Sequence, residues 1–138
     1  MRVVHISDTH LGYTAYRGLD PELGINQREA DIFAVFKQAI DKILEISPDL
    51  VLHTGDLFDS VRPSNRSLSL ALEQLLRLST VGIPVVIIAG NHSMPKMRDT
   101  GSVFQLFTLF PNFFPVYKGR YETISIKASP RRGLTPEG

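Results

Sequence analysis

Three short apolar segments, each followed by polar residues, constrain the fold of this chain more than any other feature. They lie at residues 1–7, 50–54 and 84–89, and their content of valine, isoleucine and leucine predicts strands. Between them, residues 26–46 and 64–79 carry apolar side chains at three- and four-residue spacing, which predicts helices. This alternation predicts an α/β fold with a parallel sheet and right-handed crossovers.

The chain after the third segment is predicted to add a short helix and a hairpin. The helix is expected at residues 102–110, and the hairpin at 116–127 about Gly119. The third segment itself, 84–89, is a continuous apolar run of the kind found in sheets covered on both faces. Residues 127–138 combine proline, glycine and charge, which is typical of a disordered tail.

The composition indicates one globular domain and excludes several classes of protein. A length of 138 residues, 43% of them hydrophobic, suits one domain with a real core. The sequence has no apolar run long enough for a transmembrane helix and no signal-peptide pattern, so we expect no membrane association. The chain lacks cysteine, which excludes disulfides and thiolate zinc sites and fits a reducing cytoplasm. Because the net charge is only +1, nucleic-acid binding would need local basic groups or bound metal.

Polar clusters follow each of the three predicted strands. Parallel sheets place ligands outside the carboxyl ends of their strands, so these clusters are expected to meet at one edge. The first contains Asp8 and His10, the second Gly55, Asp56 and Asp59, and the third Gly90, Asn91 and His92. This edge of the sheet is therefore the candidate functional site.

The residue types in these clusters favour a metal centre. Side chains at i and i+2 of an extended segment point the same way, so Asp8 and His10 are expected to reach one cation together. Asp56 has two oxygens and can bridge two cations, and Asn91 offers a carbonyl oxygen to the second. His92 remains to donate a proton to a leaving oxygen or to stabilise charge on a phosphate. Oxygen and nitrogen ligands suit manganese, iron, magnesium or zinc without choosing among them.

Each cluster taken singly also has a simpler interpretation. An Asp-x-His sequence, or a Gly-Asp after a strand, is a common surface turn. His5 and His53 lie inside predicted strands and are interpreted as packed core residues. Asp59 is expected to orient its neighbours rather than to bind metal. The metal interpretation depends on all three clusters occurring in order at the ends of successive strands.

The segments SDTHLG, GDLFD and AGNH, in this order and spacing, resemble the first three motifs of the calcineurin-like metallophosphoesterases. HISDTHLG together with GDLFDSVRPS is more narrowly similar to double-strand-break repair nucleases of the SbcD/MRE branch. The resemblance implies a sandwich of two sheets flanked by helices, around two divalent metal ions that are usually Mn²⁺. It implies that Asp8 and His10 bind the first ion, Asp56 bridges both, Asn91 binds the second, and His92 is the catalytic histidine.

The sequence departs from the pattern of this family at two points. Family members usually carry an acid after GNH that would orient the histidine, and this chain has Ser93 there. The family's later motifs supply further histidine ligands, whereas none of the four histidines here follows His92. We therefore expect residues 1–126 to be the N-terminal part of the family domain, and 127–138 to be a disordered or unrelated tail. A truncated or frameshifted chain, or a fragment, of this kind is expected to be inactive alone.

Charged and apolar side chains outside the motifs suggest partners. Six residues in or beside the motif loops form a candidate footprint for DNA ends or single-stranded DNA: Tyr16, Arg17, Arg62, Arg66, Lys96 and Arg98. Loops are often charged without such a role. The helices at 65–79 and 102–110 carry more apolar residues than one sheet face can bury, which favours a homodimer unless another part of the domain covers them. The resemblance implies dimerisation through this region and work with an SMC-like ATPase.

Three functions remain open at this stage. The resemblance favours a metal-dependent phosphodiesterase, namely the exonuclease or endonuclease subunit of a DNA repair system. A general phosphoesterase acting on small phosphate esters or cyclic nucleotides is the first alternative. The second is a non-catalytic dimerisation or DNA-binding module that keeps the motifs as relics.

Overall fold

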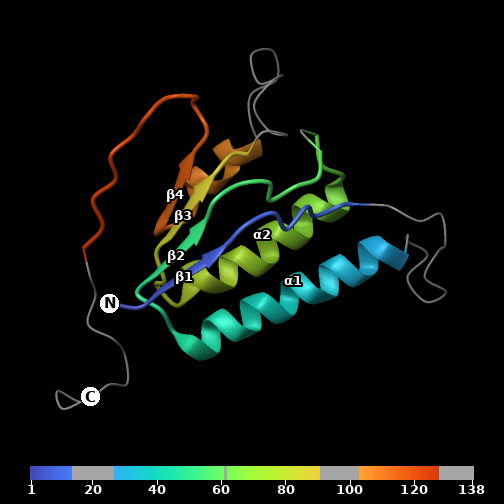
Figure 1. The fold of residues 1–138 in the computed structure, drawn as a ribbon, viewed down its shortest axis with the longest axis horizontal. Coiled ribbons are helices and arrows are strands. Elements are labelled where there is room, and N and C mark those ends of the chain that lie inside the picture. Colours follow the sequence, from blue (N-terminus) through green and yellow to red (C-terminus); the bar gives the residue numbers. More distant parts are fainter. Residues whose placement is uncertain (14–26, 61, 91–102, 128–138) are drawn as a thin grey trace.

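A four-stranded parallel sheet forms the centre of the protein (Figure 1). The computed structural model describes residues 1–13, 27–60, 62–90 and 103–127. The strands are β1 (Val3–Ile6), β2 (Leu50–His53), β3 (Val85–Ile88) and β4 (Phe113–Val116). They lie in chain order, and every neighbouring pair is parallel. The predicted α/β fold with a parallel sheet is confirmed.

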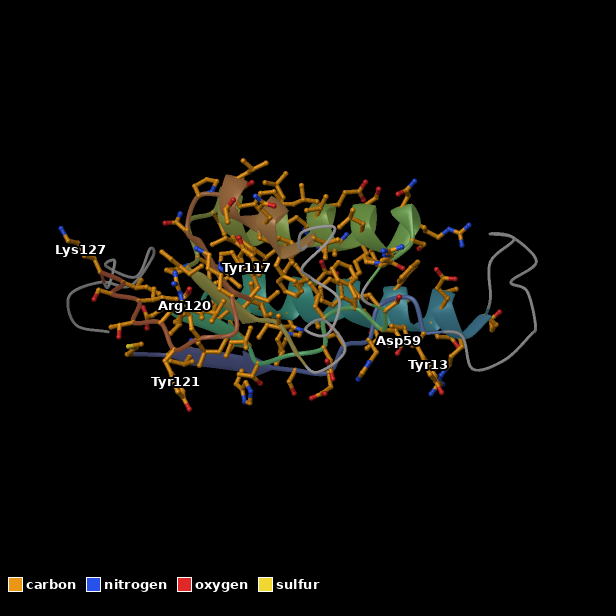
Figure 2. The ribbon with its side chains drawn as sticks, turned by 90° about the horizontal axis from the view of Figure 1, so that it is seen from above. Tyr13, Asp59, Tyr117, Arg120, Tyr121 and Lys127 are labelled. Carbon is orange, nitrogen blue, oxygen red and sulfur yellow. The ribbon has the colours of Figure 1, made fainter. Side chains whose placement is uncertain are left out.

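Two long helices connect the strands, α1 (Gln27–Ile46) before β2 and α2 (Asn65–Thr80) before β3. A short 3-10 helix, η1 (Val103–Leu109), precedes β4. Ser64 caps the N-terminus of α2, because its side chain accepts a hydrogen bond from the Ser67 amide. Figure 2 shows both helices on the same side of β1. Within the described residues, no helix has the length and apolar character needed to cross a membrane.

The core lies between the sheet and these helices. Alternate strand residues point into it, among them Val51, His53 and Ile87. The helices contribute residues such as Ile40 and Leu75, which are fully buried. Aromatic rings of Phe58, Phe104, Phe107 and Phe113 extend the core under η1 through edge and stacked contacts: 6.5 Å between the centroids of Phe58 and Phe104, 5.6 Å for Phe104 and Phe107, and 6.1 Å for Phe107 and Phe113.

The opposite face of the sheet has no covering layer among the described residues. Val3 is 44% exposed and Ile88 39% exposed on this face. The third strand was expected to be covered on both faces. Within the described residues, only its helix-facing side is covered. His5 lies on this open face and is exposed, so its assignment to the core was wrong; His53 is 1% exposed, as predicted.

The hairpin expected at 116–127 does not form. The strand instead begins at Phe113 and pairs in parallel with β3, where the Val85 amide donates to the Asn112 carbonyl. Asn112 has a φ of 65°, which turns the chain from η1 into the sheet. Residues 117–127 contain no strand, and most of their side chains are exposed.

Candidate metal centre

The loops that follow β1 and β2 are joined by backbone hydrogen bonds beyond the ends of the strands. The Asp8 amide donates to the Gly55 carbonyl at 2.9 Å, and the His10 amide donates to the Asp56 carbonyl at 2.9 Å. The pairing continues to an isolated parallel bridge between Leu11 and Phe58. The two loops therefore form one unit at the carboxyl edge of the sheet, where the sequence places the first two clusters.

The candidate ligands Asp8, His10 and Asp56 all have left-handed backbone conformations, with φ values of 55°, 45° and 53°. Asp8 and His10 are thus not in an extended segment, and the reason given for their meeting was wrong. β1 ends at Ile6, and the left-handed turns redirect both side chains. Such conformations cost non-glycine residues on the order of 1 kcal/mol or more and are concentrated at functional sites.

The three side chains converge on one point. Ligand atoms of Asp8, His10 and Asp56 all lie within 4.8 Å of one another. His10 Nε2 lies 3.8 Å from Asp8 Oδ1 and 3.9 Å from Asp56 Oδ2. Two ligands that each lie about 2.1 Å from a shared cation are about 3–4.2 Å apart. The donor set and its spacing therefore fit a divalent cation.

Neighbouring groups orient two of these ligands. Ser7 Oγ donates to Asp8 Oδ2 at 2.6 Å. On the far side of the imidazole, His10 Nδ1 lies 3.2 Å from Asp59 Oδ1, which leaves Nε2 facing Asp8 and Asp56. Histidine ligands commonly present their second nitrogen to a carboxylate in this way. The contact supports the expectation that Asp59 orients its neighbours, and Figure 2 shows Asp59 beside Tyr13 at one end of the molecule.

The end of β3 reaches the same place through Gly90. A Cβ atom at Gly90 would collide with the carboxylate and the backbone nitrogen of Asp56. A Cβ at Gly55 would lie 3.3 Å from the Gly90 Cα. Glycine at position 90 therefore lets the third loop start directly against Asp56. Asn91 and His92, which follow it, lie outside the described residues.

The profile of the calcineurin-like phosphoesterase family matches residues 1–135. The chain belongs to the calcineurin-like phosphoesterase family. Its members use divalent metals, in agreement with the oxygen and nitrogen donors that this chain gathers at the edge of its sheet.

Curated relatives of this chain carry the name DNA double-strand break repair protein Mre11. The protein from Methanococcus maripaludis is 43% identical over 106 residues, which are 77% of this chain and 27% of that protein. The protein from Methanocaldococcus jannaschii is 47% identical over 96 residues, 70% of this chain and 24% of that protein. The chain thus matches about a quarter of the length of these relatives.

Only some of the candidate DNA contacts lie within the described residues. Tyr16, Arg17, Lys96 and Arg98 lie outside the described residues. Arg62 is exposed, and Arg66 Nη1 lies 3.6 Å from Glu29 Oε2 of α1. The structure thus gives Arg66 an acidic neighbour within the chain. Tyr13, 40% exposed, lines a hollow together with Asp8, His10 and Asp59 and adds an aromatic surface beside the candidate metal ligands.

Thr9 lies between two candidate ligands and was not among the residues that the motifs predicted. Thr9 Oγ1 donates to the Leu57 carbonyl at 3.0 Å and lies 3.1 Å from His53 Nε2. Burial lowers the pKa of His53 to about 4, against the opposing effect of the Asp8 and Asp56 carboxylates, so the ring is neutral near pH 7. The signal for these contacts was the position of Thr9 between Asp8 and His10, but only the folded structure pairs it with His53.

Proposed function

We propose that this chain is the N-terminal part of a metal-dependent phosphodiesterase, the nuclease subunit of a DNA repair system. The convergence of Asp8, His10 and Asp56 on strained loops at the sheet edge is the observation that carries the proposal. The similarity to proteins named DNA double-strand break repair protein Mre11 supports DNA as the substrate. We propose 1–126 as the family part and 127–138 as a tail, although the family match runs to residue 135.

The proposed centre holds two divalent cations, with Mn²⁺ the expected metal and Mg²⁺, Fe²⁺ or Zn²⁺ the alternatives. Bound cations would supply Lewis-acid activation of water and of the phosphodiester. Asp8 and His10 would hold one ion, Asp56 would contribute to both, and Asn91 would contribute to the other. His92 would donate a proton to the leaving oxygen. Ser93 provides no carboxylate to orient that histidine.

DNA ends or single-stranded DNA are the proposed substrates. Tyr13 offers a face on which an unpaired base can stack next to the ligands, and Arg62 is free to approach a phosphate from the second loop. An SMC-like ATPase is the proposed partner, by resemblance to the nuclease branch. The absence of cysteine from the sequence is compatible with the cytoplasm as its compartment.

A homodimer through residues 65–79 and 102–110 is also proposed. Leu76 on α2 is 46% exposed, and Leu106 and Leu109 on η1 are 38% and 77% exposed. Exposed leucines on two neighbouring helices are a common feature of subunit interfaces.

Titration with Mn²⁺ followed by DNA binding tests the proposed function. The full chain should bind Mn²⁺ in a calorimeter, and Asp56→Ala should lose binding more completely than Asn91→Ala, because Asp56 is the anionic candidate bridge. Fluorescence anisotropy of a labelled single strand should rise with the chain and Mn²⁺ present. We expect no DNA cleavage, because the second ion would have few protein ligands and a loosely placed ion loses the two-metal geometry.

Other outcomes separate the alternatives. Hydrolysis of a chromogenic phosphodiester without DNA binding would favour a general phosphoesterase. DNA binding without any Mn²⁺ binding would favour a non-catalytic module. DNA cleavage that His92→Ala abolishes would support the nuclease and show that the chain is active alone.

A further inference from the structure

A chain of hydrogen bonds runs behind the candidate ligands and encloses the backbone of Asp56. The Gly55 amide donates to His53 Nδ1 at 3.4 Å. His53 Nε2 lies 3.1 Å from Thr9 Oγ1, and that hydroxyl donates to the Leu57 carbonyl at 3.0 Å. This series of hydrogen bonds therefore starts at the residue before Asp56 and ends at the residue after it.

The partner atoms fix the direction of this chain. A threonine hydroxyl has one proton, and Thr9 gives it to Leu57, so the contact with His53 requires an Nε2–H donor. His53 Nδ1 is then the acceptor that the Gly55 amide needs. The ring is the neutral Nε2–H tautomer, and its burial keeps it neutral near pH 7.

These hydrogen bonds connect the two loops that carry the candidate ligands. Thr9 lies between Asp8 and His10 in the first loop, and Gly55 and Leu57 flank Asp56 in the second. His53 is 1% exposed in the last position of β2, so the ring is held by the core while its two nitrogens face the two loops. A ring fixed in the core can set the separation of the loops.

We propose that His53 and Thr9 form a positioning pair that sets the distance and orientation of Asp56 relative to Asp8 and His10. This inference rests on the proposed metal centre. The pair touches no candidate ligand side chain in the contacts above; it acts through the backbone of Gly55 and Leu57 and through the place of Thr9 in the first loop. Left-handed conformations at Asp8, His10 and Asp56 need such support, because the chain would otherwise relax out of them.

The protein contains a matched pair that lacks this connection. His5 Nε2 lies 2.7 Å from Thr54 Oγ1, so a histidine and a threonine again join β1 to the end of β2. This second pair is exposed on the open face of the sheet. Replacing each threonine by valine removes one hydroxyl from the same kind of contact and keeps the branched side chain.

The test compares Mn²⁺ binding of the full chain with that of Thr9→Val, Thr9→Ser and Thr54→Val. Calorimetry gives the affinity, and electron paramagnetic resonance of bound Mn²⁺ reports the geometry of its ligands. Loss of a group that is hydrogen-bonded directly to a metal ligand typically weakens metal affinity about 10- to 100-fold, and a loss at the lower end of this range is expected here because the pair acts through the backbone. We expect that loss and an altered spectrum for Thr9→Val, recovery in Thr9→Ser, and wild-type behaviour for Thr54→Val.

Two measurements keep the outcome clear if Thr9→Val is poorly folded. Circular dichroism at the titration temperature gives the folded fraction, and the measured affinity is corrected for this fraction. Nitrogen NMR of the metal-free wild-type chain should show His53 as the Nε2–H tautomer, and an Nδ1–H tautomer would overturn the proposal without any variant.

The outcomes distinguish this inference from the proposed function. If the wild-type chain does not bind Mn²⁺, the metal centre and the positioning pair both fail. If the wild-type chain binds Mn²⁺ and Thr9→Val binds it equally well with the same spectrum, the positioning pair alone is wrong. Equal losses in Thr9→Val and Thr54→Val would also overturn it, since a general effect on stability would then explain both.

Discussion

Asp56 is enclosed by close contacts that leave its carboxylate little freedom. Gly90 lies against the backbone and the carboxylate of Asp56. The backbone carbonyl of Asp56 accepts a hydrogen bond from the His10 amide. Asp56 itself has a φ of 53° in a turn that its neighbours hold. The position of this carboxylate therefore depends on residues that are not ligands.

Gly90→Ala should weaken Mn²⁺ binding and destabilise the chain. The new methyl group would collide with Asp56, and overpacking of this kind typically costs about 1–3 kcal/mol. Calorimetric titration and chemical denaturation measure the two effects. Gly82→Ala is the control, because its methyl group meets open space while its φ of 78° is still unfavourable for alanine. Gly82→Ala should lose stability but keep its Mn²⁺ affinity. Equal losses of Mn²⁺ affinity in the two variants would contradict the prediction.

His53 should make the metal-free chain less stable in mild acid. Burial lowers its pKa in the folded state to about 4, below the ordinary value of 6.5. The unfolded chain therefore takes up the proton first, so the contribution is present above pH 6.5 and is lost as the pH falls toward 4. Linkage gives a loss of about 2 kcal/mol between pH 7 and pH 5.

Urea denaturation at both pH values checks this loss. The His53→Gln variant serves as the reference, because its side chain does not titrate and the carboxylates of the two proteins are the same. A wild-type chain that loses no more stability than His53→Gln over this interval would show that His53 is not a neutral buried group.

The helices depend on local signals that the sequence makes explicit. Ser64 begins α2 with a hydrogen bond of 3.1 Å from the Ser67 amide, and its hydroxyl donates to Ser67 Oγ at 3.0 Å. Pro48 follows α1, which ends at Ile46. These signals fix where a helix starts and stops, and the buried stripes of α1 and α2 then fix which face meets the sheet.

Ser64→Ala should destabilise the chain by about 1 kcal/mol, because the Ser67 amide at the first turn of α2 loses its side-chain acceptor. Thermal denaturation measures the change. Ser64→Asp is a suitable companion, since aspartate also caps helices and should keep most of the stability. A Ser64→Ala variant as stable as the wild type would mean that water replaces the cap at no cost.

The exposed leucines of α2 and η1 bear on the oligomeric state of the whole protein. We expect the purified chain to sediment as a dimer or larger species at roughly 50 μM, a range in which micromolar contacts are populated. Leu109→Glu should shift it to monomer, because Leu109 is 77% exposed at the proposed interface. Val35→Glu on α1, at a residue 63% exposed, is the control and should leave the association unchanged. A monomeric wild-type chain would contradict the proposed dimer.

Local sequence patterns were sufficient to predict the first three strands, the two long helices and the order of these elements. Short apolar segments identified β1, β2 and β3, and apolar residues at helical spacing identified α1 and α2. The rule for parallel sheets predicted that Asp8, His10 and Asp56 would meet at one edge. These predictions succeeded because each rests on contacts between residues close in sequence or on a general property of parallel sheets.

Features that depend on contacts between distant parts of the chain could not be predicted from local sequence patterns. β4 begins before the predicted hairpin of residues 116–127, and its pairing with β3 follows from the turn at Asn112 and the packing of Phe113. His5 and His53 look alike along the chain, but one lies on the open face of the sheet and the other under the helices. The left-handed ligand loops and the contact of Thr9 with His53 arise only when residues 44 positions apart are brought together, because long-range packing rather than local preference sets their geometry.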